Sequence, residues 1–131
     1  MASNRWRRAD HKRPIIVDGG PASSTNSATW TNWDAVQKSN AGDGFGVILV
    51  DGLACIDLAH CFDDACVLLP WAVDAIRNVD PLFIEWSLPG DGVHMLHEHA
   101  PAAYRREAFG AGMVERFSHS RFIRCTFQSI N

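Results

Sequence analysis

The chain has 131 residues, of which 47% are hydrophobic and 21% charged, and its formal net charge is −3, values typical of one soluble globular domain. No apolar run approaches the ~20 residues that a membrane-spanning helix needs, and the first residues lack the hydrophobic stretch of a signal peptide, which indicates a cytoplasmic protein. None of the four cysteines forms a Cys-x-x-Cys pair, so we expect reduced thiols, with a zinc site on Cys61, Cys66 and a histidine as the alternative.

The charges are distributed unevenly. Residues 1–13 hold five basic side chains and one acid, residues 101–131 hold five arginines and two acids, and residues 34–98 hold eleven acids and two basic side chains. The two ends are therefore suited to phosphate groups and the centre to cations. Two solvated basic ends would give the same pattern.

The first third of the chain is expected to contain little regular structure. The segment up to Thr29 is rich in Ser, Gly, Pro and Asn, so it is predicted to be irregular, with a loop over residues 21–29. A short helix is predicted over Trp30–Lys38, because three apolar residues recur there at helical spacing. These residues are Trp30, Trp33 and Val36.

The centre of the chain contains a hairpin signal followed by a helix signal. Two apolar runs, 45–50 and 53–58, flank Asp51-Gly52, a dipeptide that favours the tight turn of a β-hairpin. Residues 67–78 are apolar at helical spacing and predict a helix that packs on the core. Pro70 is compatible with the first turn of that helix, where a missing N–H costs little.

The last third is predicted to be mostly strand. Residues 83–87 and 93–97 read as two strands joined by a Gly-rich turn, and residues 101–112 as a polar connector. A closing hairpin is predicted from 113–117 and 121–127. We therefore expect an α+β fold, an antiparallel-rich sheet with packed helices in a single compact domain.

Asp57 is the first candidate for chemistry. Residues two apart in a strand project to the same face, so Asp57 and position 59 stand side by side. Two carboxylates at this spacing bracket divalent ions in two-metal phosphoryl or nucleotidyl transfer. The second position is Ala59, so only half of such a pair is present. Asp57 alone also fits an acid that caps the end of a strand.

The turn Ser87-x-x-Gly90-x-Gly92-x-His94 is the second candidate. Its glycines let the backbone turn sharply and approach a ligand closely, and Ser87 and His94 flank it on adjoining strands. Such a concave, donor-rich corner fits a triphosphate. An ordinary hairpin with a buried histidine is the alternative.

Glu115 and Arg121 are the third candidate. Glu115 alternates with Met113 and Phe117, so its carboxylate shares a strand face with core-type residues and needs a partner. A metal ion beside Asp57 would supply one, as would a salt bridge to an arginine. The guanidinium of Arg121 has the fork geometry that grips phosphate.

In this order and spacing, these segments resemble the bifunctional DNA primase/polymerase (prim-pol) domain of the archaeo-eukaryotic primase superfamily, of the phage and plasmid replication type. The resemblance covers about residues 5–127. It is carried by Lys12-Arg13-Pro14, Pro21–Thr25, Ile56-Asp57-Leu58-x-His60-Cys61, Glu85-Trp86-Ser87 with Gly90-x-Gly92-x-His94, Val114-Glu115, and Ser120-Arg121-Phe122 with Thr126.

The resemblance implies a role for each matched residue. Asp57 and Glu115 would hold Mg²⁺ or Mn²⁺, while His94 would contact the phosphates of the incoming NTP or dNTP. Further nucleotide contacts are implied in the Gly-rich turn and near both ends of the chain. They are Ser87, Gly90, Gly92, Arg121, Lys12 and Arg13, of which the last two are also candidates for binding template.

The resemblance also implies a setting for the domain. Its fold would be related to the RNA-recognition motif, and it would copy or prime single-stranded or primed DNA in the cytoplasm of a bacterial host cell. Residues 1–131 would form the catalytic domain of a longer protein in which a helicase follows.

Ala59 departs from the family pattern, which has a second acid at this position. We therefore expect weak metal binding and little activity. We interpret the alanine as an engineered replacement, with loss of the acid in the natural lineage as the alternative. A non-catalytic module that binds nucleotide or single-stranded DNA, with tryptophans as base-stacking surfaces, is the alternative function.

Overall fold

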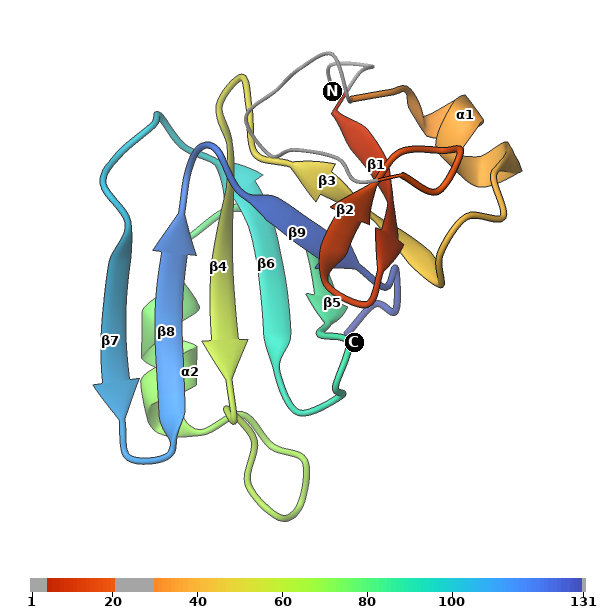
Figure 1. The fold of residues 1–131 in the computed structure, drawn as a ribbon. Coiled ribbons are helices and arrows are strands. Elements are labelled where there is room, and N and C mark those ends of the chain that lie inside the picture. The colour runs from red at the N-terminus through yellow and green to blue at the C-terminus, as the bar shows by residue number, and fades with distance from the viewer. Residues whose placement is uncertain (1–4, 21–29, 131) are drawn as a thin grey trace.

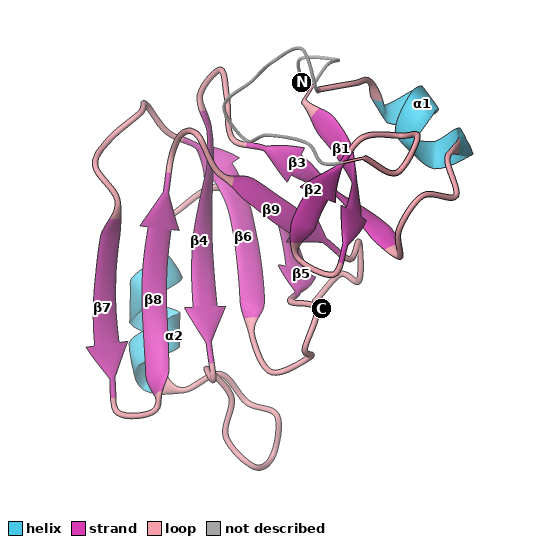
Figure 2. Ribbon diagram, viewed as in Figure 1, coloured by secondary structure: helices cyan, strands magenta, loops and turns pink. Residues whose placement is uncertain are grey.

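The computed structural model describes residues 5–20 and 30–130, and within them nine strands form two antiparallel sheets accompanied by two helices (Figures 1 and 2). The small sheet has the strand order β2-β1-β3-β9 and the large sheet the order β5-β6-β4-β8-β7. The elements are β1 Trp6–Asp10, β2 Arg13–Ile15, α1 Trp33–Lys38, β3 Gly44–Ile48, β4 Leu53–Ala59, α2 Pro70–Ile76, β5 Pro81–Trp86, β6 Val93–Glu98, β7 Arg105–Phe109, β8 Gly112–Phe117 and β9 Phe122–Cys125.

Two hydrophobic clusters cover the two faces of the large sheet. One lies between the sheets and brings Val47 and Ile123 of the small sheet against Leu53 and Cys55 at the start of β4. The other lies on the opposite face of the large sheet, where Ala72 of α2 is fully buried with residues of β4, β6 and β8. Alternate residues of β4 thus serve two cores, as the period-two geometry of a strand requires.

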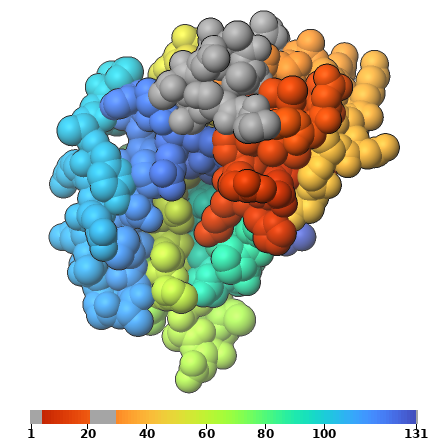
Figure 3. Space-filling model, in the orientation of Figure 1, coloured from red at the N-terminus to blue at the C-terminus, as the bar shows by residue number. Residues whose placement is uncertain are grey.

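The far end of β4 leaves the cover of the small sheet. Cys55 is fully buried, whereas Asp57 and Ala59, further along the same face, are partly exposed. The small sheet crosses one end of the large sheet, while β7, β8 and the end of β4 lie clear of it (Figure 1). The space-filling view shows this open region between the N-terminal hairpin and β8 (Figure 3). The fold therefore exposes polar residues on a sheet face that is otherwise core.

The predicted antiparallel pairing in a single compact domain is confirmed, although the strands form two sheets where one was expected. The predicted hairpin over residues 45–58 is wrong. Asp51 and Gly52 do form a tight turn with positive φ values of 56° and 84°. The strands on either side then diverge, because β3 pairs with β1 and β9 whereas β4 pairs with β6 and β8. Leu49 and Leu53 are both buried between the sheets, so the turn carries the chain from one layer to the other.

The predicted closing hairpin is wrong for a similar reason. β8 pairs with β4 and β7 in the large sheet, whereas β9 pairs with β3 in the small one. Arg121 precedes β9 and lies in the crossing between the sheets. The predicted pair 83–87 and 93–97 does form, as β5 and β6.

Other boundaries also differ from the predictions. Residues 6–15 form the β1–β2 hairpin instead of irregular structure, and the polar connector contains the edge strand β7. Helix α1 starts at Trp33 because the Asn32 side chain accepts a hydrogen bond from the N–H of Ala35 at 2.9 Å. Helix α2 is shorter than predicted, with Pro70 in its first turn. The predicted loop 21–29 lies outside the described residues.

Neither helix in the described part of the chain has the length and apolar character needed to cross a membrane.

Candidate functional site

Five titratable side chains form one continuous row across the large sheet. Glu85 of β5 lies opposite His94 of β6, and His94 lies opposite Asp57 of β4. Asp57 lies opposite Glu115 of β8, and Glu115 lies opposite Arg106 of β7. Directly paired residues of neighbouring antiparallel strands project to the same face. The structure therefore brings Asp57, His94 and Glu115 together on the open face, and adds Glu85.

Asp57 carries a charge that its surroundings disfavour. Its side chain is 28% exposed, and burial raises the pKa of its carboxyl, with a further increase from the neighbouring Glu115. His94 is the largest opposing influence on this pKa, followed by Lys12 and Arg121. A cation between Asp57 and Glu115 would offset both the cost of burying the charged Asp57 carboxylate and its repulsion by Glu115.

His94 lies between two carboxylates. Its Nε2 is 3.8 Å from Oδ2 of Asp57, and its Nδ1 is 3.2 Å from Oε2 of Glu85. The histidine is buried, and Glu85 is completely inaccessible to solvent. Glu85 thus contacts Nδ1 of the ring, while Nε2 faces Asp57.

Glu115 has a partner from a segment that was predicted to be a connector. The hydroxyl of Tyr104 donates a hydrogen bond to Oε2 of Glu115 at 2.5 Å, and this carboxylate raises the pKa of Tyr104. The Tyr104 ring stacks on Phe117, with ring centroids 5.1 Å apart, and the guanidinium of Arg121 lies 4.6 Å from the centre of the Phe117 ring. Glu115 is therefore bordered by a short stack of planar groups.

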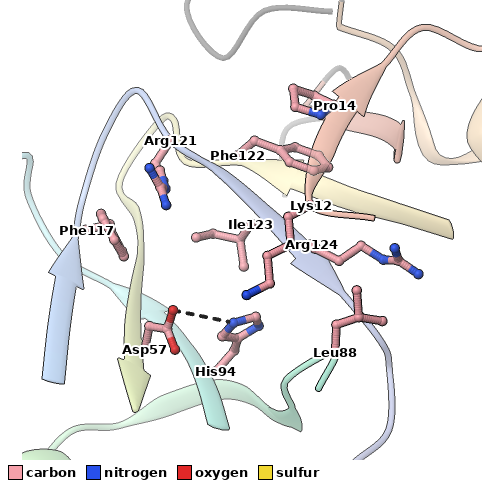
Figure 4. A pocket seen from close by; sticks show the side chains of 10 residues that line it. All are labelled: Lys12, Pro14, Asp57, Leu88, His94, Phe117, Arg121, Phe122, Ile123 and Arg124. Carbon is pink, nitrogen blue, oxygen red and sulfur yellow. Dashed lines mark ion pairs between the residues drawn. The ribbon is translucent and has the colours of Figure 1, made fainter. Parts of the chain in front are cut away.

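A cavity of about 260 Å³ opens beside this row, where the two sheets meet. Asp57 and His94 lie on the side of the large sheet, and Lys12 and Arg121 face them from the side of the small sheet (Figure 4). The other lining residues are Pro14, Leu88, Phe117, Phe122, Ile123 and Arg124. A carboxylate, an imidazole and several cations thus converge on one concave surface.

The basic residues at the cavity differ in their partners. Arg124 is committed to Asp43, at 2.9 Å, and to the carbonyl of His11. Within residues 5–20 and 30–130, neither Lys12 nor Arg121 makes an ion pair. Both cations facing the cavity are therefore uncommitted to any carboxylate of these segments, although the Arg121 guanidinium lies over the Phe117 ring, and they are suited to an anionic ligand.

Arg13 was a sequence candidate that the structure does not bring to the cavity. Its guanidinium is exposed and pairs with Asp10, the residue opposite it in the β1–β2 hairpin. Lys12, its neighbour in the turn, lines the cavity instead.

The Gly-rich turn supports the site from beside it. The N–H of Ser87 donates to the carbonyl of Gly92, and the N–H of Gly90 donates to the carbonyl of Ser87, both at 2.9 Å. Gly90 has a φ of 85°, and a Cβ on Gly92 would lie 2.4 Å from the carbonyl oxygen of Leu58. Ser87, Gly90 and Gly92 do not line the cavity, so their observed contribution is to shape the turn and let β6 lie against β4.

Position 59 lies on the open face, as the spacing predicted. Ala59 is partly exposed, pairs with Met113 of β8, and has its Cα 3.5 Å from where a Cβ on Gly92 would stand. A longer side chain at position 59 would project next to Asp57. An acid at position 59 would therefore lie on the same sheet face as Asp57 and Glu115.

Within the described residues, the three side chains whose potential ligand atoms converge lie at the surface, and they do not include Asp57, His94 or Glu115. Among the described residues, Asp10, His11 and Asp43 place one ligand atom each within 4.8 Å of one another. Arg13 and Arg124 already pair with these acids. No such three-residue group in the described segments includes a cysteine, and the four thiols are free, with only Cys66 exposed.

Sequence reasoning missed two residues of the site, Glu85 and Tyr104. Glu85 interrupts an apolar strand in the same way as Glu115, so its carboxylate gave a usable signal. Tyr104 gave none, because its contact with Glu115 depends on the pairing of β7 with β8.

No known protein family matches the chain, and no curated protein is significantly similar to it.

Proposed function

We propose that the chain is a primase/polymerase domain of the phage and plasmid replication type, which binds a nucleoside triphosphate in the cavity between the two sheets and transfers nucleotides to DNA. The observation that carries this proposal is the row His94, Asp57 and Glu115 beside a cavity with the uncommitted cations Lys12 and Arg121. Nucleotidyl transfer needs such an arrangement, because phosphate charge must be neutralised where two oxygens exchange at phosphorus.

Each residue has a role in this proposal. Lys12 and Arg121 bind the phosphates, and Nε2 of His94 contacts them from the opposite wall of the cavity. Asp57 and Glu115 are adjacent oxygen donors of the kind that Mg²⁺ and Mn²⁺ prefer, and the raised pKa of Asp57 fits a carboxyl that needs a cation. A bound divalent ion would supply charge neutralisation at the phosphates.

Ala59 explains why this chain would be a poor catalyst. Two carboxylates remain where two-metal chemistry typically uses three or more donors, so metal affinity and rate both fall. The large antiparallel sheet, with α2 on one face and the site on the other, agrees with the proposed relation to the RNA-recognition motif. In this proposal the natural domain works with a helicase that follows it.

The direct test restores the acid. The Ala59→Asp variant is expected to extend a labelled primer on a DNA template with Mn²⁺ and dNTPs about 100-fold faster than the chain with Ala59, because even the loss of a group behind a metal ligand costs about 10–100-fold. The extension products are resolved by denaturing electrophoresis. Ala59→Asn, which has the same size without the charge, is the matched control and should remain as slow as the native chain.

The alternative is a module that binds nucleotide or single-stranded DNA without catalysis, and the same cavity favours it through Lys12 and Arg121. It predicts that a folded Ala59→Asp variant binds triphosphate by calorimetry but extends no primer in Mg²⁺ or Mn²⁺. That result would overturn the polymerase proposal and keep the binding site.

A further inference from the structure

Glu85 is a fully buried acid whose carboxylate is completely surrounded by hydrogen-bond donors. It has no solvent exposure. The N–H of Thr126 lies 3.1 Å from both carboxylate oxygens, and the N–H of Phe127 lies 3.1 Å from Oε1. Burying a carboxylate is costly unless donors compensate it. These two backbone donors and the His94 ring provide that compensation.

The direction of the hydrogen bonds places a hydrogen on Nδ1 of the His94 ring. The backbone N–H groups can only donate, so Glu85 acts toward them as an acceptor, and an ionised carboxylate has only acceptors to offer. Nδ1 of His94, 3.2 Å from Oε2, therefore carries the hydrogen and donates it to Glu85. Nε2 is left facing Asp57 and the cavity.

The segment that donates to Glu85 is itself held to β5 by hydrogen bonds. After β9, the chain runs along β5, where the N–H of Trp86 donates to the carbonyl of Gln128 at 2.9 Å and the Thr126 hydroxyl donates to the carbonyl of Trp86 at 2.6 Å. Glu85 therefore joins β5, β6 and the segment after β9 at one point. Rotation of the imidazole would break the contact between its Nδ1 and Oε2 of Glu85.

We propose that Glu85 is a positioning residue for His94. By accepting the hydrogen on Nδ1, it fixes the orientation of the ring and directs Nε2 toward Asp57 and the cavity. This inference rests on the proposed function only for the ligand that Nε2 meets.

Glu85→Gln gives a sharp test because the amide has one acceptor and one donor end. The amide oxygen is expected to take the two backbone N–H groups, which turns the NH₂ toward Nδ1 of His94. Two donors cannot face each other, so Nδ1 must become the acceptor and the hydrogen must move to Nε2. A purely structural role for Glu85 does not predict this exchange.

The tautomer is measured from the ¹⁵N and ¹H shifts of the His94 ring in long-range correlation spectra, without nucleotide or metal. In the native chain we expect Nδ1 to be protonated and shielded from exchange with water. In Glu85→Gln we expect the ring hydrogen on Nε2 and an unprotonated Nδ1. Glu98→Gln replaces an exposed acid on β6, the strand that carries His94. It is the matched control and should leave the ring signals unchanged.

Two results would overturn the inference. One is a native ring whose Nδ1 carries no hydrogen, which decides the question even where Glu85→Gln does not fold. The other is a folded Glu85→Gln variant with the native tautomer. Both readouts are independent of primer extension, so an inactive Ala59→Asp variant would contradict the proposed function and leave this test valid.

Discussion

At the scale of single residues, Asp57 contributes charge to the site at a cost to the fold. Burial and the neighbouring Glu115 raise its pKa above the reference value of 3.8. A raised carboxyl pKa means that the folded state binds the proton more tightly than the unfolded state. The stabilisation that this provides is complete below pH 3.8 and is lost as pH rises through the folded pKa. At neutral pH the ionised Asp57 therefore destabilises the protein.

Asp57→Asn is accordingly expected to raise the melting temperature at pH 7, because it removes a disfavoured charge and keeps the size of the side chain. The difference from the native chain should shrink as the pH is lowered toward 4. Thermal unfolding followed by circular dichroism across this range measures it. Asp64→Asn, at an exposed loop position, is the control and should change little. A lower melting temperature for Asp57→Asn at neutral pH would contradict this account of the site.

At the scale of the elements, the close contact of β4 and β6 depends on Gly92. A Cβ there would meet the carbonyl oxygen of Leu58 at 2.4 Å, a backbone atom that cannot move aside alone. Gly92→Ala is expected to destabilise the fold by about 1–3 kcal/mol, the usual range for overpacking, and to move His94 relative to Asp57.

Gly90→Ala is the matched comparison within the same turn. A Cβ on Gly90 meets no atom within 4 Å, so only its positive φ of 85° is strained, at about 1–2 kcal/mol. Chemical denaturation measures the stability of both variants, and their affinities for triphosphate distinguish the two substitutions further. We expect Gly90→Ala to retain affinity and Gly92→Ala to lose it. Equal loss of affinity in both variants would show that the turn, and not the β4–β6 contact, matters for the site.

At this scale, sequence patterns predict local strand pairs and turns but not which distant strands pair. The strand pair β5–β6 and the Asp51-Gly52 turn follow from local signals, because alternation and turn chemistry act over a few residues. The pairing partners of β3 and β9 do not follow from local signals, because in each predicted hairpin the two strands belong to different sheets. Buried residues such as Leu49 and Leu53 fit either arrangement locally, and only packing between the sheets decides. The edge strand β7 was missed because it is mostly exposed and its polar sequence has no apolar alternation.

For the candidate site, the sequence singled out individual residues but not how they are arranged. Asp57, His94 and Glu115 were identifiable because each is a polar group within an apolar strand. The separation of Lys12 from Arg13 was not, because it depends on which way each side chain leaves the β1–β2 turn. Arg13 pairs with Asp10 across the hairpin, and Lys12 reaches the cavity.

At the scale of the whole molecule, the site depends on both sheets. Lys12 belongs to the N-terminal hairpin of the small sheet, and Asp57 and His94 belong to the large sheet (Figure 4). Lys12→Ala is therefore expected to weaken triphosphate binding by about tenfold or more, as for a charge-assisted hydrogen bond. Arg13→Ala, one residue away, should change the affinity less than about twofold, since its loss removes only an exposed ion pair.

Isothermal titration calorimetry with a non-hydrolysable triphosphate measures both variants against the native chain. Equal losses for Lys12→Ala and Arg13→Ala would indicate general attraction by the basic N-terminus. In that case the cavity between the sheets would not be the binding site.

The most direct test of the central claim is a crystal of Ala59→Asp grown with Mn²⁺ and a non-hydrolysable triphosphate, with anomalous diffraction recorded at the manganese edge. The account predicts an anomalous peak between the carboxylates of Asp57 and Glu115, with the phosphates within reach of Lys12, Arg121 and Nε2 of His94. A manganese peak only at Asp10, His11 and Asp43, or a triphosphate bound away from the cavity, would contradict it.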